Sequence, residues 1–184
     1  ADLTKSLVHP YVPRFPRHVS YDLVLFGSWR RKGVYVGEKQ IASPGSYPVA
    51  GFNFAPMYNL NYKLRFGVSL DGVYDGSANV YTEDALVEYD AGSGSSRRKF
   101  LVPGIQNQLA LGLSGRAEYV MPFFTIGVGL GTNVLGRGDL RGLYQVFALK
   151  INVTRSSFLH IGYNLQDFQT PNYLMLGLGF RFNN

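Results

Sequence analysis

The side chains that could do chemistry lie close together near the end of the chain. Ser157, His160 and Asn164 fall within one short segment, and a histidine near a hydroxyl group is the usual pairing that activates a nucleophile. His160 is also the only histidine well inside the predicted barrel, because His9 falls in the tail and His18 at the start of a strand. Ser156 and Ser157, however, fall at a predicted tight turn. We therefore treat His160, Asn164 and Ser157 as weak catalytic candidates.

Metal and cofactor chemistry have little support in the sequence. The chain has no cysteine, which excludes a disulfide framework and a thiolate metal site. The segment 82–99 carries four acidic residues, but their spacing matches no calcium-binding loop. Glycines, serines and three basic residues follow them, so a flexible, partly self-neutralising surface loop is the better interpretation. We expect no metal and no cofactor.

Composition separates the possible classes of protein. The formal charge is +6, but the basic residues are scattered and no module organises them for nucleic acid. No apolar stretch approaches the length of a transmembrane helix. Hydrophobic residues make up 46% of the chain while the mean hydropathy is only −0.04. Polar residues therefore interrupt the apolar ones throughout, as in strands with one oily face and one polar face.

Such alternation predicts an all-β fold, an eight-stranded antiparallel transmembrane β-barrel. The connections between the segments are alternately tight and long, which places tight turns on one side of the membrane and loops on the other. An even number of strands returns the chain to its starting side, so we expect both termini to be periplasmic. Residues 1–17 are predicted to be a periplasmic tail, and 18–184 the barrel. The expected strands are 18–29, 47–60, 62–75, 107–120, 123–135, 143–153, 157–166 and 172–182.

The two faces of these strands differ in charge as well as in polarity. A soluble sandwich or a lipocalin-like barrel would also alternate, but its inner face would be apolar. Here the charged residues share a face with small and polar residues, and an eight-stranded barrel is just wide enough for side chains to fill. We therefore expect a packed polar network in the lumen and not an ion path. Its expected members are Asp22, Lys63, Arg65, Asp71, Arg116, Glu118, Lys150 and Arg181.

The predicted loops carry basic residues close to the ends of the strands. Guanidinium groups suit the geometry of phosphate groups, so these residues could bind the phosphates of lipopolysaccharide. Ordinary solvated loop charge is the alternative. The candidates for binding lipid phosphate are Arg30, Arg31, Lys32, Arg137 and Arg141.

The last third of the chain resembles a known family. The pair Pro171-Asn172 and the ending Leu-Gly-x-Gly-Phe-Arg-Phe at 176–182 resemble the lipid A 3-O-deacylase (PagL-like) family, also labelled acyloxyacyl hydrolase-like. The resemblance implies an eight-stranded outer-membrane barrel that cuts an ester bond of lipid A. It also implies a serine activated by histidine, in a His-x-Ser-Asn motif on the next-to-last strand that faces the lipid, with an acidic residue that orients the histidine.

The sequence departs from that motif. Counting back from Pro171-Asn172 puts Gly162 in the place of the histidine and Asn164 in the place of the serine. Moving the histidine position to His160 leaves Gly162 as the nucleophile, and no glutamate follows. Strand alternation also turns His160 and Asn164 inward, away from lipid. The catalytic motif is therefore not intact.

Three functions follow from this pattern. The favoured one is a non-catalytic barrel on the deacylase-like scaffold in the outer membrane of a Gram-negative bacterium. It would be a structural or accessory subunit that contacts outer-membrane lipid and lipopolysaccharide, another outer-membrane protein or complex, or both. The alternative is an active lipid A deacylase, an acyl ester hydrolase with a rearranged site around His160. A small channel is the third class.

Overall fold

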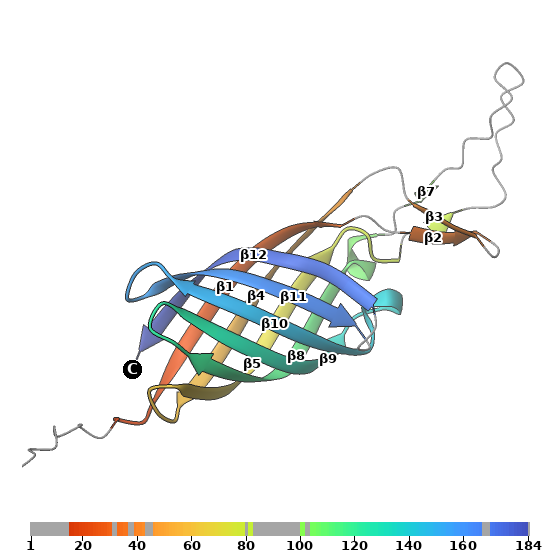
Figure 1. The fold of residues 1–184 in the computed structure, drawn as a ribbon. Helices are drawn as coiled ribbons and strands as arrows, with labels where there is room; N and C mark the ends of the chain where they lie inside the picture. Colours follow the sequence, from red (N-terminus) through yellow and green to blue (C-terminus); the bar gives the residue numbers. More distant parts are fainter. Residues whose placement is uncertain are drawn as a thin grey trace, which may run out of the picture.

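The computed structural model describes residues 15–30, 33–36, 39–42, 46–79, 81–82, 100–101, 104–166 and 170–183. Eight antiparallel strands form a closed barrel in the order β1-β12-β11-β10-β9-β8-β5-β4 (Figure 1). The predicted eight-stranded antiparallel barrel is confirmed. Its strands are β1 (His18–Arg30), β4 (Tyr47–Asn59), β5 (Leu64–Asp75), β8 (Leu109–Val120), β9 (Phe124–Leu135), β10 (Leu143–Asn152), β11 (Ser157–Gln166) and β12 (Thr170–Asn183).

The first and last strands close the barrel. β1 pairs with β12 from Ser20↔Asn183 to Gly27↔Leu176, and with β4 along its whole length. The described chain therefore begins and ends at the same end of the barrel (Figure 1). The short connections 60–63, 121–123 and 153–156 lie at this end, which we call the turn end. The opposite end is called the loop end.

Longer connections at the loop end carry small elements that the sequence did not predict. The connection between β1 and β4 contains a hairpin of β2 (Gly33–Val36) and β3 (Lys39–Ala42). The connection between β5 and β8 contains the short pair β6 (Tyr81–Thr82) and β7 (Phe100–Leu101) and the 3₁₀ turn η1 (Ile105–Asn107). A second 3₁₀ turn, η2 (Gly138–Leu140), joins β9 to β10.

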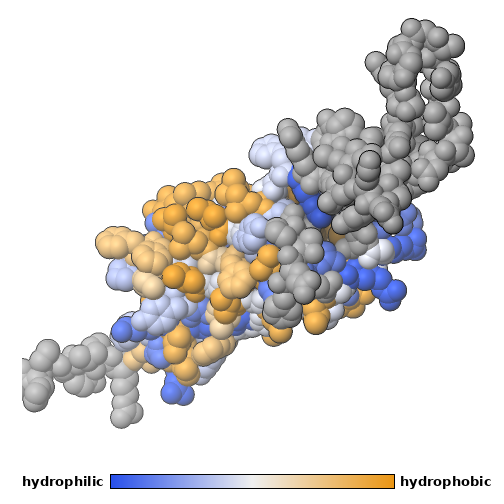
Figure 2. Space-filling model, turned by 45° about the vertical axis from the view of Figure 1, so that its right-hand side comes forward, coloured by the Kyte–Doolittle hydropathy of each residue, from blue (hydrophilic) through white to orange (hydrophobic). Residues whose placement is uncertain are grey.

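Side chains alternate between the lumen and an outer wall, as strand geometry requires. The outward positions of β9 and β12 are apolar and exposed, and include Ile126, Val128, Leu174, Leu176 and Leu178. On the face seen in Figure 2, hydrophobic side chains cover much of the barrel wall. In the described part of the chain, no helix is long and apolar enough to cross a membrane.

The start of β5 differs from the prediction by two residues, and the difference removes Lys63 from the lumen. The side chain of Asn61 accepts hydrogen bonds from the backbone N–H groups of Lys63 and Leu64, at 2.8 and 2.9 Å. An asparagine that binds the following backbone in this way stabilises a turn. β5 therefore begins at Leu64, and Lys63 lies exposed in the turn.

Glycines on the lumen side make room for large side chains. A Cβ atom at Gly179 would overlap the ring of Phe158, and one at Gly51 would overlap Phe26. Phe158 is one of the largest fully buried side chains among the described residues. In a narrow barrel the inner positions must combine large and small residues to fill the taper.

Candidate functional site

A cluster of charged side chains fills the turn-end half of the lumen and centres on Asp22 of β1. Its carboxylate accepts hydrogen bonds from Arg65 Nη2 at 3.0 Å, Lys150 Nζ at 2.8 Å and Arg181 Nε at 3.0 Å. Glu118 is the second acid: it binds Arg65 Nη1 at 3.0 Å and also Lys150. Three cations thus share two carboxylates, and all but Arg181 are almost completely buried.

An aromatic ring covers part of this cluster. Lys150 Nζ lies 4.9 Å from the ring centroid of Phe158, and Arg181 Cζ lies 5.3 Å from it. A cation over the face of a ring is attracted by its quadrupole, most strongly where water is excluded. Phe158 therefore stabilises the two cations that β10 and β12 contribute.

A second cluster is centred on Asp71 of β5. Arg116 Nη2 donates to its Oδ1 at 2.7 Å, and the hydroxyls of Ser69, Ser114 and Tyr144 donate to its two oxygens, each at 2.6 Å. Four donors thus bind this carboxylate, and one of them is the guanidinium of Arg116. Both oxygens of Asp71 are occupied by donors of the protein itself, which favours a structural role.

The two clusters contain seven of the eight residues predicted for the lumen network. Lys63 is the exception, for the reason given above. The charged residues that the structure brings together are Asp22, Arg65, Asp71, Arg116, Glu118, Lys150 and Arg181.

Arg30 closes the lumen at the loop end. Its Nη1 donates to Oδ2 of buried Asp75 at 2.8 Å, while Oδ1 of Asp75 accepts from the backbone N–H and hydroxyl of Ser77. Arg30 was expected to bind lipid phosphate, but its guanidinium is directed at a carboxylate. Asp75 was absent from the predicted network because it lies at the last position of its strand.

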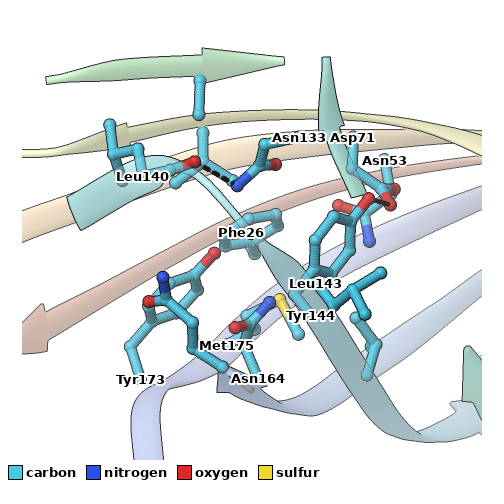
Figure 3. Close-up of a pocket in the computed structure, with 15 residues that line it drawn as sticks. Phe26, Asn53, Asp71, Asn133, Leu140, Leu143, Tyr144, Asn164, Tyr173 and Met175 are labelled. Carbon is cyan, nitrogen blue, oxygen red and sulfur yellow. Dashed lines mark hydrogen bonds between the residues drawn. The ribbon is translucent and has the colours of Figure 1, made fainter. Parts of the chain in front are cut away.

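Between the polar clusters and the loop end lies an apolar group of side chains. Phe26, Tyr144, Tyr173 and Met175 pack there with Val49, Val146 and Ala148. They border a cavity of about 30 Å³, enough for about two waters. Figure 3 shows Tyr144, Tyr173, Asn164 and Met175 lining it, with Leu140 of η2 across from them. The lumen is thus filled, and the channel hypothesis has no wide path to use.

His160 lies inside the barrel. It pairs across the strands with Lys150 on one side and Gly177 on the other, and only 1% of it is exposed. Neither ring nitrogen has a hydrogen-bond partner among the described residues. A histidine in this position has no adjacent serine to activate and no contact with lipid.

The other two catalytic candidates lie apart from His160. Asn164 is buried and lines the loop-end cavity, where a β-bulge separates it from Leu165 in the pairing of β11 with β12. Ser157 lies at the turn end, and its hydroxyl is 2.7 Å from that of Thr154. The structure therefore does not bring His160, Asn164 and Ser157 together.

The outward side of β11 carries no base, and its one serine is Ser157, which lies at the turn end opposite Phe180. The other outward residues are Leu159, Ile161, Tyr163 and Leu165, the first three clearly exposed. Among the side chains that the structure describes, no group of three or more histidine, cysteine or acidic residues could hold a metal ion. The wall is built for contact with hydrocarbon.

The predicted phosphate ligands have separate locations at the loop end. Arg137 and Arg141 flank η2 and are exposed. Arg137 Nη1 lies 3.5 Å from Asn107 Oδ1, which ties η2 to η1. Arg31 and Lys32 lie outside the described residues.

Several members of the lumen clusters were missed in the sequence. Ser20, Ser69, Ser114 and Tyr144 bind the charged groups directly. Strand alternation could have found them, because each shares the inward parity of its charged neighbours. Which acid each one binds could not be found, since that depends on how the strands are staggered around the barrel.

Comparison with known proteins identifies a matching family and several solved structures with a similar chain path. The family model described as "Acyloxyacyl hydrolase, C-terminal domain" (PagL_C) matches residues 19–184. A search of curated proteins found no match. A solved structure of Ail, the attachment invasion locus protein of Yersinia pestis, is 15% identical with a TM-score of 0.45, covering 90% of this chain and 99% of that one.

A second solved structure is Neisserial surface protein A (NspA), at 15% identity and a TM-score of 0.40, covering 91% of this chain and 97% of that one. These are similarities of chain path, and the barrel itself is established by its strand pairing. The match of the family model extends from the second residue of β1 through β12. The chain therefore belongs to the acyloxyacyl hydrolase C-terminal-domain family, with the resemblance to PagL-like barrels confirmed.

Proposed function

We propose that this protein is a non-catalytic outer-membrane barrel of a Gram-negative bacterium, built on the PagL-like scaffold. It acts as a structural or accessory subunit that contacts lipopolysaccharide and a larger outer-membrane protein assembly. Its turn end faces the periplasm and its loop end faces outward, because outer-membrane barrels have tight periplasmic turns and longer external loops.

One observation carries the proposal: the strand on which the family's motif should lie has no catalytic side chain toward lipid. Leu159, Ile161 and Tyr163 occupy its outward positions, and outward Ser157 lies at the turn end, on the face opposite to that of His160. His160 is enclosed by Lys150, Gly177 and the rest of the lumen. A base must come within hydrogen-bond reach of the proton that it removes, and a buried His160 cannot reach an ester in the membrane.

The catalytic part is tested by incubating the purified, folded barrel with lipid A. We expect no release of hydroxyacyl chains, and no difference between the unmodified protein and His160→Ala. An active member of the family, assayed in the same detergent and lipid, is the positive control. Release of a hydroxyacyl chain that His160→Ala abolishes would overturn the proposal and establish the deacylase.

Contact with lipopolysaccharide is assigned to the exposed arginines beside η2. Replacing Arg137 and Arg141 together by glutamine removes two guanidinium groups, each worth about 1 kcal/mol at an anionic membrane surface. We expect about a tenfold or larger loss of affinity for lipopolysaccharide, measured by binding to the barrel in nanodiscs. Lipopolysaccharide stripped of its phosphates should bind both proteins equally. Equal binding of intact lipopolysaccharide to both would contradict the assignment.

The accessory role is tested by extraction of the tagged barrel from its native membrane in mild detergent. Co-migration with a larger outer-membrane protein in stoichiometric amount is the expected result. A barrel that always migrates alone, also after cross-linking in the intact membrane, would contradict it.

A further inference from the structure

A hollow interrupts the apolar outer wall along β8. The outward positions of this strand hold Leu113, then Gly115 and Ala117, then Tyr119. Val68 and Leu130 flank Gly115 on the neighbouring strands. The two small residues leave an open hollow of about 500 Å³ against the wall. A Cβ atom at Gly115 would meet nothing within 4 Å, so the hollow is unfilled by the protein.

A second hollow lies nearer the turn end of the same strand. Asn61, Tyr62, Lys63, Leu64 and Tyr119 line it, with a volume of about 310 Å³. Tyr119, which lines this hollow, is the next outward residue of β8 after Ala117, which lines the first. Gly115 pairs with Val68 of β5. Val68 lies five residues after Lys63, and five residues of a strand span about 17 Å. This matches the roughly 15 Å depth of one leaflet's hydrocarbon.

Lys63 supplies an unpaired positive charge at the mouth of these hollows. It is exposed, and it forms no ion pair among the described residues. Its surroundings are one-sided in charge: Arg17 and Arg155 are also exposed at the turn end, whereas all acids with described side chains are buried. These acids are Asp22, Asp71, Asp75 and Glu118. The electrostatic potential at the surface of the turn end is therefore positive and favours the binding of an anion.

We infer that one glycerophospholipid with an anionic headgroup binds along β8 in the turn-end leaflet. Its phosphate lies against Lys63, with the rings of Tyr62 and Tyr119 at the level where aromatic side chains meet headgroups. One acyl chain lies in the hollow over Ala117 and Gly115, against Val128 and Leu130 of β9. This inference requires a membrane-inserted barrel but neither the absence of catalysis nor a protein partner.

Native mass spectrometry of the intact barrel, exchanged into phosphatidylglycerol or phosphatidylcholine of equal chain length, tests the site. The variant Gly115→Leu fills the hollow without a clash, and we expect it to weaken binding of phosphatidylglycerol about tenfold or more, since several buried methylenes lose contact. Ala117→Leu fills the same hollow from the next position, so a failure of one variant to fold leaves the other. Gly27→Leu is the matched control, because Gly27 also has open space outward, on β1.

The headgroup is tested separately with Lys63→Gln. We expect this variant to lose about fivefold in affinity for phosphatidylglycerol, the worth of one basic residue at a membrane surface, and to leave phosphatidylcholine binding unchanged. Arg155→Gln removes an exposed charge at another turn and is the control. Equal effects of Gly115→Leu and Gly27→Leu, or equal effects of Lys63→Gln and Arg155→Gln, would overturn the inference.

Discussion

Replacement of Asp22 by asparagine is expected to lower the free energy of unfolding by about 3–5 kcal/mol, the usual cost of leaving a buried charge without its partner. Asp22 accepts bonds from Arg65, Lys150 and Arg181. Asparagine keeps the shape and removes the charge, so Arg65 and Lys150 retain only Glu118, and Arg181 loses the carboxylate that it binds. The water-sized cavity of the lumen is lined by Asp71, and not by Asp22 or its cationic partners.

Urea titration of the barrel in detergent measures this effect, with fluorescence of Trp29, the only tryptophan of the chain. Trp29 is 78% exposed on the outer wall, so unfolding moves it from an apolar to an aqueous environment. Asp75→Asn is the matched control, because its one cationic partner, Arg30, is partly open to solvent. Solvent screening limits that loss to about 1 kcal/mol. If Asp22→Asn and Asp75→Asn lower the free energy of unfolding equally, the Asp22 cluster contributes no more to stability than the pair of Asp75 and Arg30.

Gly179→Ala is expected to destabilise the barrel by about 1–3 kcal/mol or more, as inserted methyl groups do in packed cores. The new methyl group would overlap the ring of Phe158. Phe158 is fully buried, and it cannot withdraw without leaving Lys150 and Arg181, whose charges lie against its face.

The shift of the unfolding midpoint and the mobility of the unheated barrel on a gel measure this change. Gly115→Ala is the matched substitution on the outer wall, where the methyl group meets open space. Alanine restricts the unfolded chain more than glycine does, so we expect Gly115→Ala to raise the free energy of unfolding by up to about 1 kcal/mol. If both glycines tolerate alanine equally, Phe158 is free to move and the description of the lumen as rigidly packed is wrong.

The strands and their faces were predictable because a strand has a simple period. In the middle of β9 and in the second half of β12 the apolar residues alternate with glycines and polar residues, and no other regular structure has that period. Charge then decided which face is inward: Arg65, Arg116 and Lys150 cannot face hydrocarbon.

Other features depended on contacts that a sequence pattern does not carry. Lys63 has the inward parity of β5, but the backbone N–H groups of Lys63 and Leu64 donate to the side chain of Asn61, and the strand therefore begins later than predicted. The pairing of Arg30 with Asp75 joins β1 to β5 across β4, and it depends on the stagger of strands that are not neighbours. The hairpin of β2 and β3 is too short for its alternation to stand out within a loop.

The ion pair between Asp22 and Arg181 joins residues that are 159 positions apart. It connects the first strand to the last, and Arg65 and Lys150 converge on the same carboxylate from β5 and β10. A nascent chain that lacks its final strand would leave the buried carboxylate of Asp22 beside an open seam, without Arg181 as one of its three cationic partners. Partly inserted states are therefore costly, and assembly should proceed as a single slow event in which neutralisation and seam formation coincide.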